Sequence, residues 1–463
     1  MKKTSLLNSL LLLLFCIMLV ACSSNETQEE VTGETEVNSN SEDVTLTIAV
    51  GNNPQMPALE KLSKEYTEET GVKVDFALIP ENDLRQTLTN HATIGGGQYD
   101  IVQIGSYEMA FWADNGWLED LEPYFEKMSD EELAEYDRED LLPPVKQSLT
   151  IDEKQYGLPF YAEASMMYYN TEVFEKAGIE IPTNPTWDEI YEIATQLHDP
   201  ANNQYGITMR GQPGWGMNGA VFGSMIHAFG SRWVDENWDV QFTKDPNMAR
   251  AFEMYKKLLV DAGQPNIVST GYAEASQLFM EGNAAMFYDA TSLAEGFNNS
   301  ESKVYGKFEM GLAPTDVKID NTGWIWVWAL GIDPNSKHKQ EAFDFITWAT
   351  SKEYIERVAE DSGWGTVPPG TRQSTYENKD YMAETPYASD VLNSLNTIKY
   401  DEPSVDPVPY VGIQYVGIPE FAEFGTQVSE YLAEYVSGAT TLEEALEKSQ
   451  NAVETAIANG GYK

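Results

Sequence analysis

A repeated order of short apolar strands and amphipathic helices, which begins at residue 44, limits the possible folds more than any other feature of this sequence. The strands are rich in β-branched residues, and the first alternates along its length. Residues 56–70 carry apolar side chains at helical spacing, and Gly71 is a typical helix stop. Such an order favours an α/β lobe with a largely parallel sheet. The predicted strands are residues 44–50, 72–79 and 99–104.

The middle of the chain repeats this order and predicts a second α/β lobe. Thr186 as N-cap and Glu189 three residues later form a capping box, which predicts a helix that runs to about Leu197. The further predicted elements are strands at residues 205–209 and 284–288 and helices at residues 249–262 and 442–458.

The N-terminus has the features of an export signal. Two lysines precede an apolar run, residues 10–20, which is too short to span a bilayer. Small residues and Cys22 follow, and residues 19–22 resemble the lipobox of bacterial lipoproteins. The resemblance implies a signal peptide at residues 1–21 and lipid on Cys22. The alternative is an ordinary signal peptide that contains a cysteine. Acylation explains why the exported chain keeps a single cysteine, since Cys16 lies in the signal.

Residues 22–43 are expected to be the lipidated cysteine and a flexible acidic tether. This stretch has no aromatic residue, no lysine and no arginine, so it cannot bury enough apolar surface to offset its ordering entropy. A tail without a role is the plainer alternative.

Composition excludes several classes of function. The chain has 463 residues and a formal net charge of −45, which makes nucleic acid a poor partner. The charge keeps an exposed protein soluble, and a saline or alkaline habitat is an open alternative. The four histidines are scattered, and no signature of a catalytic metal or nucleophile is present, so we expect no cofactor and no metal. Residues 214–219 match G-x-G-x-x-G, but they lack the βαβ context of a nucleotide site, and we expect a loop that approaches a ligand.

Four stretches in order resemble the extracellular solute-binding proteins of ABC importers, the class that takes up sugars. They are residues 99–102, residues 157–163 with Tyr169 and Asn170, residues 185–189 and residues 279–286. A finer match is similar to the branch that binds linear polyols such as mannitol and sorbitol. It rests on residues 105–108, 229–235, 289–291, 324–330, 367–372 and 406–410.

The resemblance implies an α/β fold of the periplasmic-binding-protein type, with two lobes and a hinged cleft between them. Lobe 1 would comprise residues 44–160 plus 290–328, and lobe 2 residues 161–289 plus 329–463. The chain would cross between the lobes near residues 160–163, 288–291 and 326–332. The implied protein is a monomeric receptor without enzyme activity. It would be lipid-anchored on the outer face of the cell membrane, bind a small polyhydroxy ligand and deliver it to the permease subunits of the importer.

A polyhydroxy ligand needs flat aromatic surface for its C–H faces and charged partners for its hydroxyls. Glu163 and Asp289 stand at expected crossings, although solvated carboxylates are the usual fate of such residues. Trp324, Trp326 and Trp328 alternate and share one face of a strand; we expect one or two of them in a cleft, with Trp326 preferred over the alternative of a core stripe.

The remaining candidates come from position and from the scarcity of basic residues. Trp215 and Trp233 lie in glycine-rich, irregular stretches, where binding residues concentrate. Arg210 and Arg372 offer planar donors to hydroxyls, with structural ion pairs as the equal alternative. Ligands bind beyond the carboxyl ends of parallel strands. This adds three residues at or near the predicted strand ends, namely Asn52, Gln103 and Tyr107.

Other functions remain open at this point. A receptor for another mono- or oligosaccharide is the nearest. A secreted glycosidase that uses two carboxylates is the alternative from the class of enzymes, and it would turn over oligosaccharides. A structural surface protein would bind no small molecule.

Overall fold

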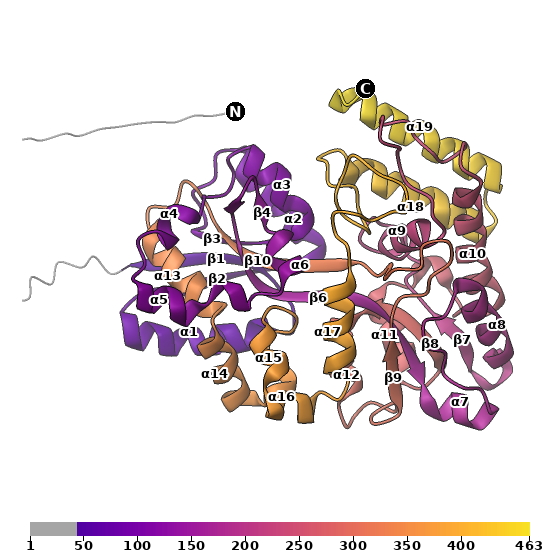
Figure 1. Cartoon of the computed structure of the whole chain (residues 1–463), viewed down its shortest axis with the longest axis horizontal. Helices are drawn as coiled ribbons and strands as arrows, with labels where there is room; N and C mark the ends of the chain where they lie inside the picture. Colours follow the sequence, from indigo (N-terminus) through magenta and orange to yellow (C-terminus); the bar gives the residue numbers. More distant parts are fainter. Residues whose placement is uncertain (1–43) are drawn as a thin grey trace, which may run out of the picture. The chain divides into compact units, whose positions relative to one another are not determined.

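The computed structural model describes residues 44–463, which belong to one compact unit of the chain (Figure 1). The expected signal peptide, the lipidation site Cys22 and the tether lie outside the described residues. The strands are β1 (Thr45–Gly51), β2 (Lys73–Ile79), β3 (Ile101–Gly105), β4 (Thr150–Ile151), β5 (Lys154–Gln155), β6 (Leu158–Asn170), β7 (Tyr205–Thr208), β8 (Ala284–Ala290), β9 (Phe308–Gly311) and β10 (Ile325–Ile332). The helices before β7 are α1 (Met56–Thr70), α2 (Glu81–Thr93), α3 (Ser106–Asp114), α4 (Glu122–Phe125), α5 (Asp130–Tyr136), α6 (Pro143–Gln147), α7 (Thr171–Ala177) and α8 (Trp187–Leu197). The later helices are α9 (Asn218–Ala228), α10 (Pro246–Asp261), α11 (Tyr272–Met280), α12 (Ala294–Phe297), α13 (Lys339–Ala349), α14 (Lys352–Ser362), α15 (Gln373–Glu377), α16 (Lys379–Glu384), α17 (Ala388–Thr397), α18 (Phe421–Ser437) and α19 (Leu442–Gly460).

The first lobe, here called the N-terminal lobe, has the predicted parallel arrangement. Strand β1 pairs in parallel with both β2 and β3. Helix α1 has the bounds predicted from the sequence, because Leu59, Leu62 and Tyr66 turn their side chains to the core and Gly71 adopts a left-handed conformation, with φ of 79°. The amide of Gly71 caps the helix by donating to the carbonyl of Thr67.

Strand β6 is 13 residues long and belongs to both lobes (Figure 1). Its first half pairs antiparallel with β10, and β10 in turn pairs with β3. Its second half pairs with β8 and β9. A single sheet therefore runs through the molecule in the order β2-β1-β3-β10-β6-β8-β7, with β9 beside β6.

The second lobe, here called the C-terminal lobe, is built on the second half of β6 with β7, β8 and β9. Strands β7 and β8 pair in parallel, and helices α8 and α10 pack against them. The predicted capping box of α8 is present, since Thr186 accepts from the amide of Glu189 and Glu189 from that of Thr186. Helices α18 and α19 pack on each other and complete the lobe.

The lobe boundaries differ from the expected ones in two segments. Residues 291–311 were expected in the N-terminal lobe, but β9 pairs with β6 at Met167–Asn170, and Phe297 packs on Tyr168 of the C-terminal lobe. Residues 329–372 were expected in the C-terminal lobe, but β10 pairs with β3, α13 packs Phe343 between Tyr124 and Phe125, and Arg372 forms a β-bridge with Leu141. In both cases the segment packs in the lobe that contains the partner of its strand, and its position in the chain does not indicate that lobe.

The crossings follow from these pairings. The expected crossing at residues 160–163 lies on β6, which passes between the lobes. The one expected at residues 288–291 is wrong, because β8 ends in a turn that returns to β9 in the same lobe. The chain crosses back at the start of β10, which overlaps the crossing expected at residues 326–332, and a third time through α15, α16 and α17 (Figure 1).

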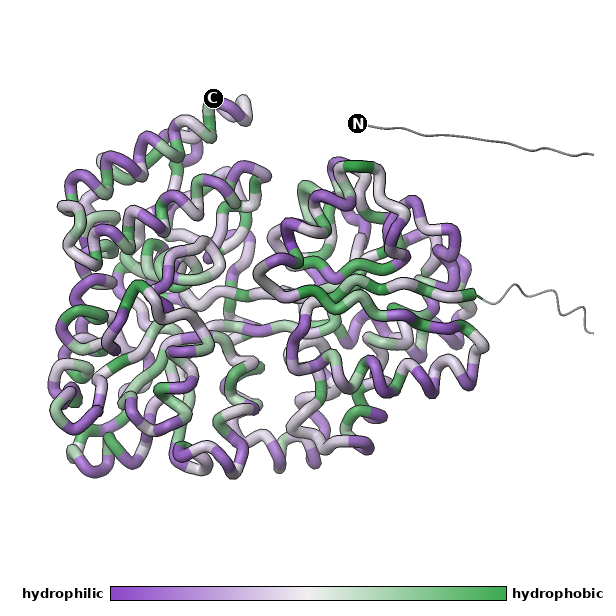
Figure 2. Tube along the Cα trace, turned by 180° about the vertical axis from the view of Figure 1, so that it is seen from behind, coloured by the Kyte–Doolittle hydropathy of each residue, from purple (hydrophilic) through white to green (hydrophobic). Residues whose placement is uncertain are grey.

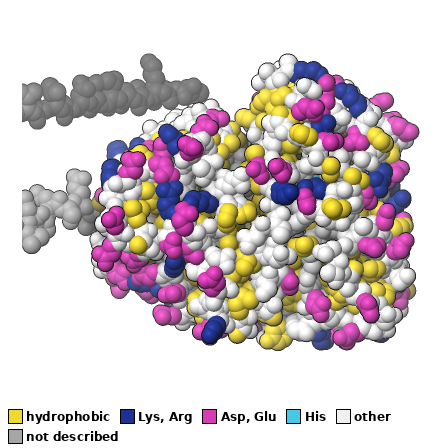
Figure 3. All heavy atoms as spheres, in the orientation of Figure 1, with side chains coloured by type: hydrophobic (Ala, Val, Ile, Leu, Met, Phe, Trp, Pro, Cys, Tyr) yellow, Lys and Arg dark blue, Asp and Glu magenta, His cyan; other side chains and the backbone are white. Residues whose placement is uncertain are grey.

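Apolar side chains concentrate on the strands, while charged ones cover the outside. Hydrophobic residues dominate β1 and β3 of the N-terminal lobe (Figure 2), and most of their side chains are buried. Aspartate and glutamate side chains are scattered over the surface among lysines and arginines (Figure 3). No helix within residues 44–463 is both long and apolar enough to cross a bilayer.

Candidate ligand-binding cleft

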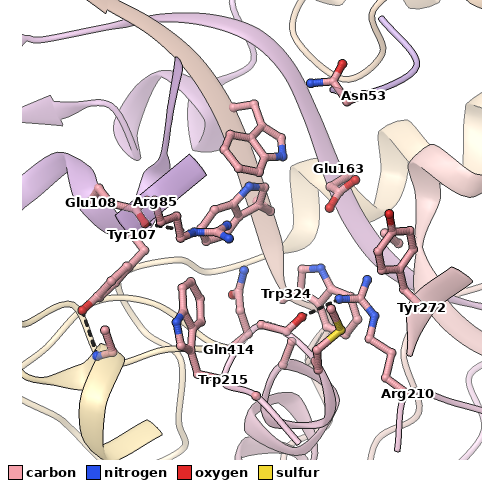
Figure 4. A pocket seen from close by; sticks show the side chains of 18 of the residues that line it. Asn53, Arg85, Tyr107, Glu108, Glu163, Arg210, Trp215, Tyr272, Trp324 and Gln414 are labelled. Carbon is pink, nitrogen blue, oxygen red and sulfur yellow. Dashed lines mark hydrogen bonds and ion pairs between the residues drawn. The ribbon is translucent and has the colours of Figure 1, made fainter. Parts of the chain in front are cut away.

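A cavity of about 780 Å³ opens where β6 and β10 connect the two lobes (Figure 4). This volume lies in the range of sites for small organic ligands. Both lobes supply its walls: α2 and α3 from the N-terminal lobe, and the loop after β7 from the C-terminal lobe. The side chains that line it include Asn52, Arg85, Tyr107, Glu108, Glu163, Arg210, Trp215, Tyr272, Trp324, Trp326, Trp328 and Gln414.

Three tryptophans form an aromatic wall of the cavity. Trp324, Trp326 and Trp328 share one face as predicted, and all three line the cavity rather than one or two. The reason is the central place of β10 between β3 and β6. The residues that alternate with them, Ile325 and Val327, are fully buried and pack on the other side of the sheet, so the whole tryptophan face is available to the cleft.

The N-terminal lobe contributes an ion pair between Arg85 on α2 and Glu108 on α3. Nε of Arg85 donates to Oε1 of Glu108 at 3.0 Å. The guanidinium also lies 4.8–5.0 Å from the ring centres of three indoles, Trp215, Trp326 and Trp328, which is cation–π geometry. Glu108 is only 4% exposed, and this burial raises the pKa of its carboxyl, while Arg85 opposes the shift. The pair is therefore held between α3 and the aromatic wall.

The C-terminal lobe contributes a second ion pair, between Arg210 and Asp289. Nε of Arg210 donates to Oδ2 of Asp289 at 2.8 Å, and Nη2 donates to Oδ1. Nη1 donates to the carbonyl of Gly216 at 2.8 Å. The guanidinium lies near the rings of Trp324 and Tyr272 (Figure 4). Asp289 is fully buried and does not line the cavity. Its expected contact with a ligand is therefore replaced by a supporting contact with Arg210.

Glu163 is a third carboxylate of the cavity, after Glu108 and the buried Asp289 behind Arg210. It stands on β6 directly opposite Trp326 on β10. Its carboxylate accepts from the hydroxyl of Ser292, and it lines the cavity as expected. A carboxylate beside an aromatic surface is the combination that a polyhydroxy ligand needs.

The strand-end residues divide into two groups. Asn52 and Tyr107 line the cavity. The hydroxyl of Tyr107 also donates to the carbonyl of Ile418 at 3.1 Å and accepts from the amide of Ala422 at 3.1 Å, which ties α3 to the C-terminal lobe. Gln103 is 1% exposed and does not line the cavity. Its Oε1 accepts from the amide of Gly51 at 2.7 Å, so it fixes the loop after β1 instead of contacting a ligand.

Two further candidates lie outside the cavity. Trp233 is 1% exposed and packs among Phe242, Phe421 and Phe424 in the C-terminal lobe, so it is a core residue. Arg372 is fully buried in the N-terminal lobe, where Nε donates to the carbonyl of Thr350 at 3.0 Å and Nη1 to Asp140 at 3.2 Å. The alternative reading of Arg372 as a structural ion pair is therefore the right one. Trp215, by contrast, lines the cavity from the glycine-rich loop, as expected.

Sequence reasoning missed Arg85, Glu108, Tyr272 and Gln414. Arg85 carried the same signal as Arg210, because basic residues are scarce among 74 acidic ones. Glu108 follows Tyr107 at a predicted strand end, which was a usable signal. Gln414 donates to the carbonyl of Ile325 at 2.8 Å from a segment without regular structure, and nothing local in the sequence indicates this.

The charged side chains that line the cavity are two arginines and two glutamates, with Asp289 behind Arg210. No histidine, lysine or aspartate lines it among the residues that the structure describes. Within residues 44–463 no cluster of histidine, cysteine, aspartate and glutamate could hold a metal ion. The cavity therefore offers aromatic faces and paired charges, without an excess of positive charge.

Comparison with known proteins shows the family. Residues 51–356 match the family of bacterial extracellular solute-binding proteins. A mannitol-binding protein of Pseudomonas aeruginosa is 39% identical over 421 residues, which cover 90% of this chain and 94% of the relative. The chain belongs to this family. The predicted membership is thus confirmed by both comparisons.

Solved structures of the family share the fold. An ABC transporter solute-binding protein of Agrobacterium vitis with bound D-mannitol is 42% identical, with a TM-score of 0.84 over 90% of this chain and 99% of that one. A solute-binding protein of Agrobacterium radiobacter in complex with ribitol is 24% identical, with a TM-score of 0.78 over 89% of this chain and 98% of that one. The predicted two-lobed α/β fold is therefore confirmed.

Proposed function

We propose that the protein captures a linear polyol of the mannitol type outside the cell and delivers it to the permease of an ABC importer. The observation that carries the proposal is the aromatic wall Trp324, Trp326 and Trp328 with an arginine–carboxylate pair on each side of the cleft. The wall offers flat surface to the carbon chain, and the charged groups offer strong hydrogen bonds to hydroxyls. The mannitol-binding relative and the mannitol-bound family member support this ligand class.

The charge of the cleft supports a neutral ligand over a sugar acid. Each arginine that lines the cavity has a carboxylate as partner, and Glu163 adds one more negative charge. A carboxylate ligand would therefore meet no uncompensated cation in the cleft. Hydroxyl groups, in contrast, can donate to Glu163 and accept from the arginines.

Calorimetric titration of the purified protein tests the proposal directly. We expect saturable binding of mannitol or sorbitol, weaker binding of glucose and maltose, and no turnover of any of them. Tighter binding of a hexose or a maltodextrin would refute the ligand class and leave the receptor function intact. Hydrolysis of oligosaccharides would refute the receptor function.

The membrane attachment is a separate part of the proposal. Acyl chains on Cys22 would hold the protein on the outer face of the membrane, with residues 23–43 as tether. Replacement of Cys22→Ala should move the protein from the membrane fraction to the medium in a cell-fractionation experiment. A variant that stays with the membrane after an alkaline wash would contradict the anchor.

A further inference from the structure

Arg85 lines the cavity, and only part of its guanidinium is engaged in hydrogen bonds to the protein. Nε of Arg85 donates to Glu108, whereas neither Nη1 nor Nη2 meets a hydrogen-bond acceptor among the described residues. Its side chain is 28% exposed, and the planes of three indoles hold the guanidinium from the sides. Arginine presents its Nη groups as a planar fork that matches a carboxylate bidentately. Taken alone, Arg85 would make this cleft a site for acidic ligands.

Glu108 cancels that charge from a buried position. Its carboxylate is 3.0 Å from Nε of Arg85, and its side chain is 5% exposed. Charges interact more strongly in such surroundings than in water, because little solvent lies between them. The negative charge of Glu108 would therefore repel a ligand carboxylate that binds on the Nη side of Arg85. A neutral hydroxyl would not.

We propose that Glu108 is the residue that makes the cleft select neutral polyols over the corresponding sugar acids. It acts through Arg85, as a positioning and neutralising partner, while Arg85 contacts the ligand. This inference rests on the proposed function and goes beyond it, because it assigns the discrimination by ligand charge to one side chain. Arg210 does not raise the same question, because all three of its nitrogens already donate to Asp289 or to the carbonyl of Gly216.

The experiment compares D-mannitol with D-mannonate, which carries a carboxylate in place of one terminal hydroxymethyl group. Calorimetry gives the Kd of each ligand for the full chain and for Glu108→Gln, in which the amide keeps the shape and can still accept from Nε of Arg85. We expect the wild-type protein to prefer mannitol. In Glu108→Gln the ratio of the two Kd values should shift toward mannonate by at least about tenfold, equivalent to about 1.4 kcal/mol.

Matched variants separate local charge from packing and from net charge. Glu108→Asp keeps the charge and should keep the wild-type ratio. Glu108→Met removes the charge without a buried amide and should shift the ratio as Gln does, which provides a second route if the Gln variant does not fold. Glu122→Gln is the control for net charge, because Glu122 makes a bidentate pair with Arg138, at 2.8 and 2.6 Å, beside Phe125 and outside the cavity. It should leave the ratio unchanged.

A ratio that stays at the wild-type value in both Glu108→Gln and Glu108→Met would overturn the inference, and so would an equal shift in Glu122→Gln or Glu108→Asp. Preference of the wild-type protein for mannonate would also overturn it. Absence of wild-type binding to either ligand would instead refute the proposed function, on which the inference rests.

Discussion

The two arginines that line the cleft, one from each lobe, are held in different ways. Arg210 of the C-terminal lobe donates to Asp289 through two nitrogens and to the carbonyl of Gly216 through the third. Arg85 of the N-terminal lobe donates to Glu108 through Nε alone, and indole faces provide the rest of its support. Arg210 is thus a fixed part of one wall of the cleft, whereas Arg85 is an adaptable hydrogen-bond donor on the other wall.

The difference in burial explains what each arrangement contributes. Asp289 is fully buried on β8, and Arg210 is 12% exposed, so their pair is part of the packing of the C-terminal lobe. Arg85 is more open, and one of its three aromatic contacts, Trp215, belongs to the opposite lobe. We therefore expect changes at the first pair to affect folding and binding together, and changes at Arg85 to affect binding alone.

The largest effect is expected for Asp289→Ala. Removal of one partner of a buried ion pair leaves the other charge uncompensated, which costs about 3–5 kcal/mol in the free energy of unfolding. Urea unfolding at neutral pH measures this loss. Asp361→Ala is the control, because Asp361 pairs with Lys61 at the surface, where such a pair is worth about 1 kcal/mol or less. Equal losses in both variants would contradict the assignment of the Arg210–Asp289 pair to the packing of the C-terminal lobe.

An intermediate effect is expected for Arg85→Lys, which keeps the positive charge beside Glu108 but removes the planar fork. The Kd for mannitol should rise about tenfold or more, because a hydrogen bond to a charged group contributes about 1.5–3 kcal/mol. The free energy of unfolding should change by less than about 1 kcal/mol, as at other partly exposed pairs. Calorimetry and urea unfolding measure the two quantities.

Arg138→Lys provides the matched comparison for Arg85→Lys, since Arg138 also lies over an aromatic ring and pairs with a glutamate away from the cavity. Its Kd for mannitol should equal that of the wild-type protein. An unchanged Kd in Arg85→Lys would show that Arg85 does not contact the ligand.

The smallest effect is expected for Trp215→Leu. This change removes the contact of Arg85 with the opposite lobe, and a cation–π contact contributes about 0.5–2 kcal/mol. Arg85 is 28% exposed, and at exposed sites such a contact is worth about 0.5–1 kcal/mol, so the Kd for mannitol should rise only about two- to fivefold in a calorimetric titration. Trp364→Leu, a change in the N-terminal lobe outside the cavity, is the control. An effect larger than that of Arg85→Lys would mean that Trp215 supports the ligand itself more than it supports Arg85.

Local sequence patterns predicted the elements well. The bounds of α1 and the capping box of α8 depend on neighbouring residues, and both are present as predicted. The alternation of Trp324, Trp326 and Trp328 also placed them on one face correctly. The expectation failed where the answer depended on pairing between distant segments: the sequence does not indicate that β10 enters the sheet between β3 and β6, or that β9 stays with β6.

The site was predictable in part for the same reason. Glu163, Arg210 and Trp215 were found because scarcity, position or a glycine-rich loop singled them out. Arg85 and Glu108 are 23 residues apart and meet only when α2 packs on β1 and α3 packs on β10. Arg372 and Arg85 cannot be distinguished by composition, yet the first is fully buried against Thr350 and Asp140 and the second faces the cavity.

The place of β10 in the sheet also bears on how the chain folds during its synthesis. Strands β1, β2 and β3 emerge first, but the partner that joins β3 to β6 begins only at Ile325. The N-terminal lobe thus stays without its central strand until most of the chain has been made. Pairing across so long a stretch of sequence closes a large loop, which slows folding. Neither lobe is a continuous piece of the sequence, so neither can be cut out and expected to fold by itself.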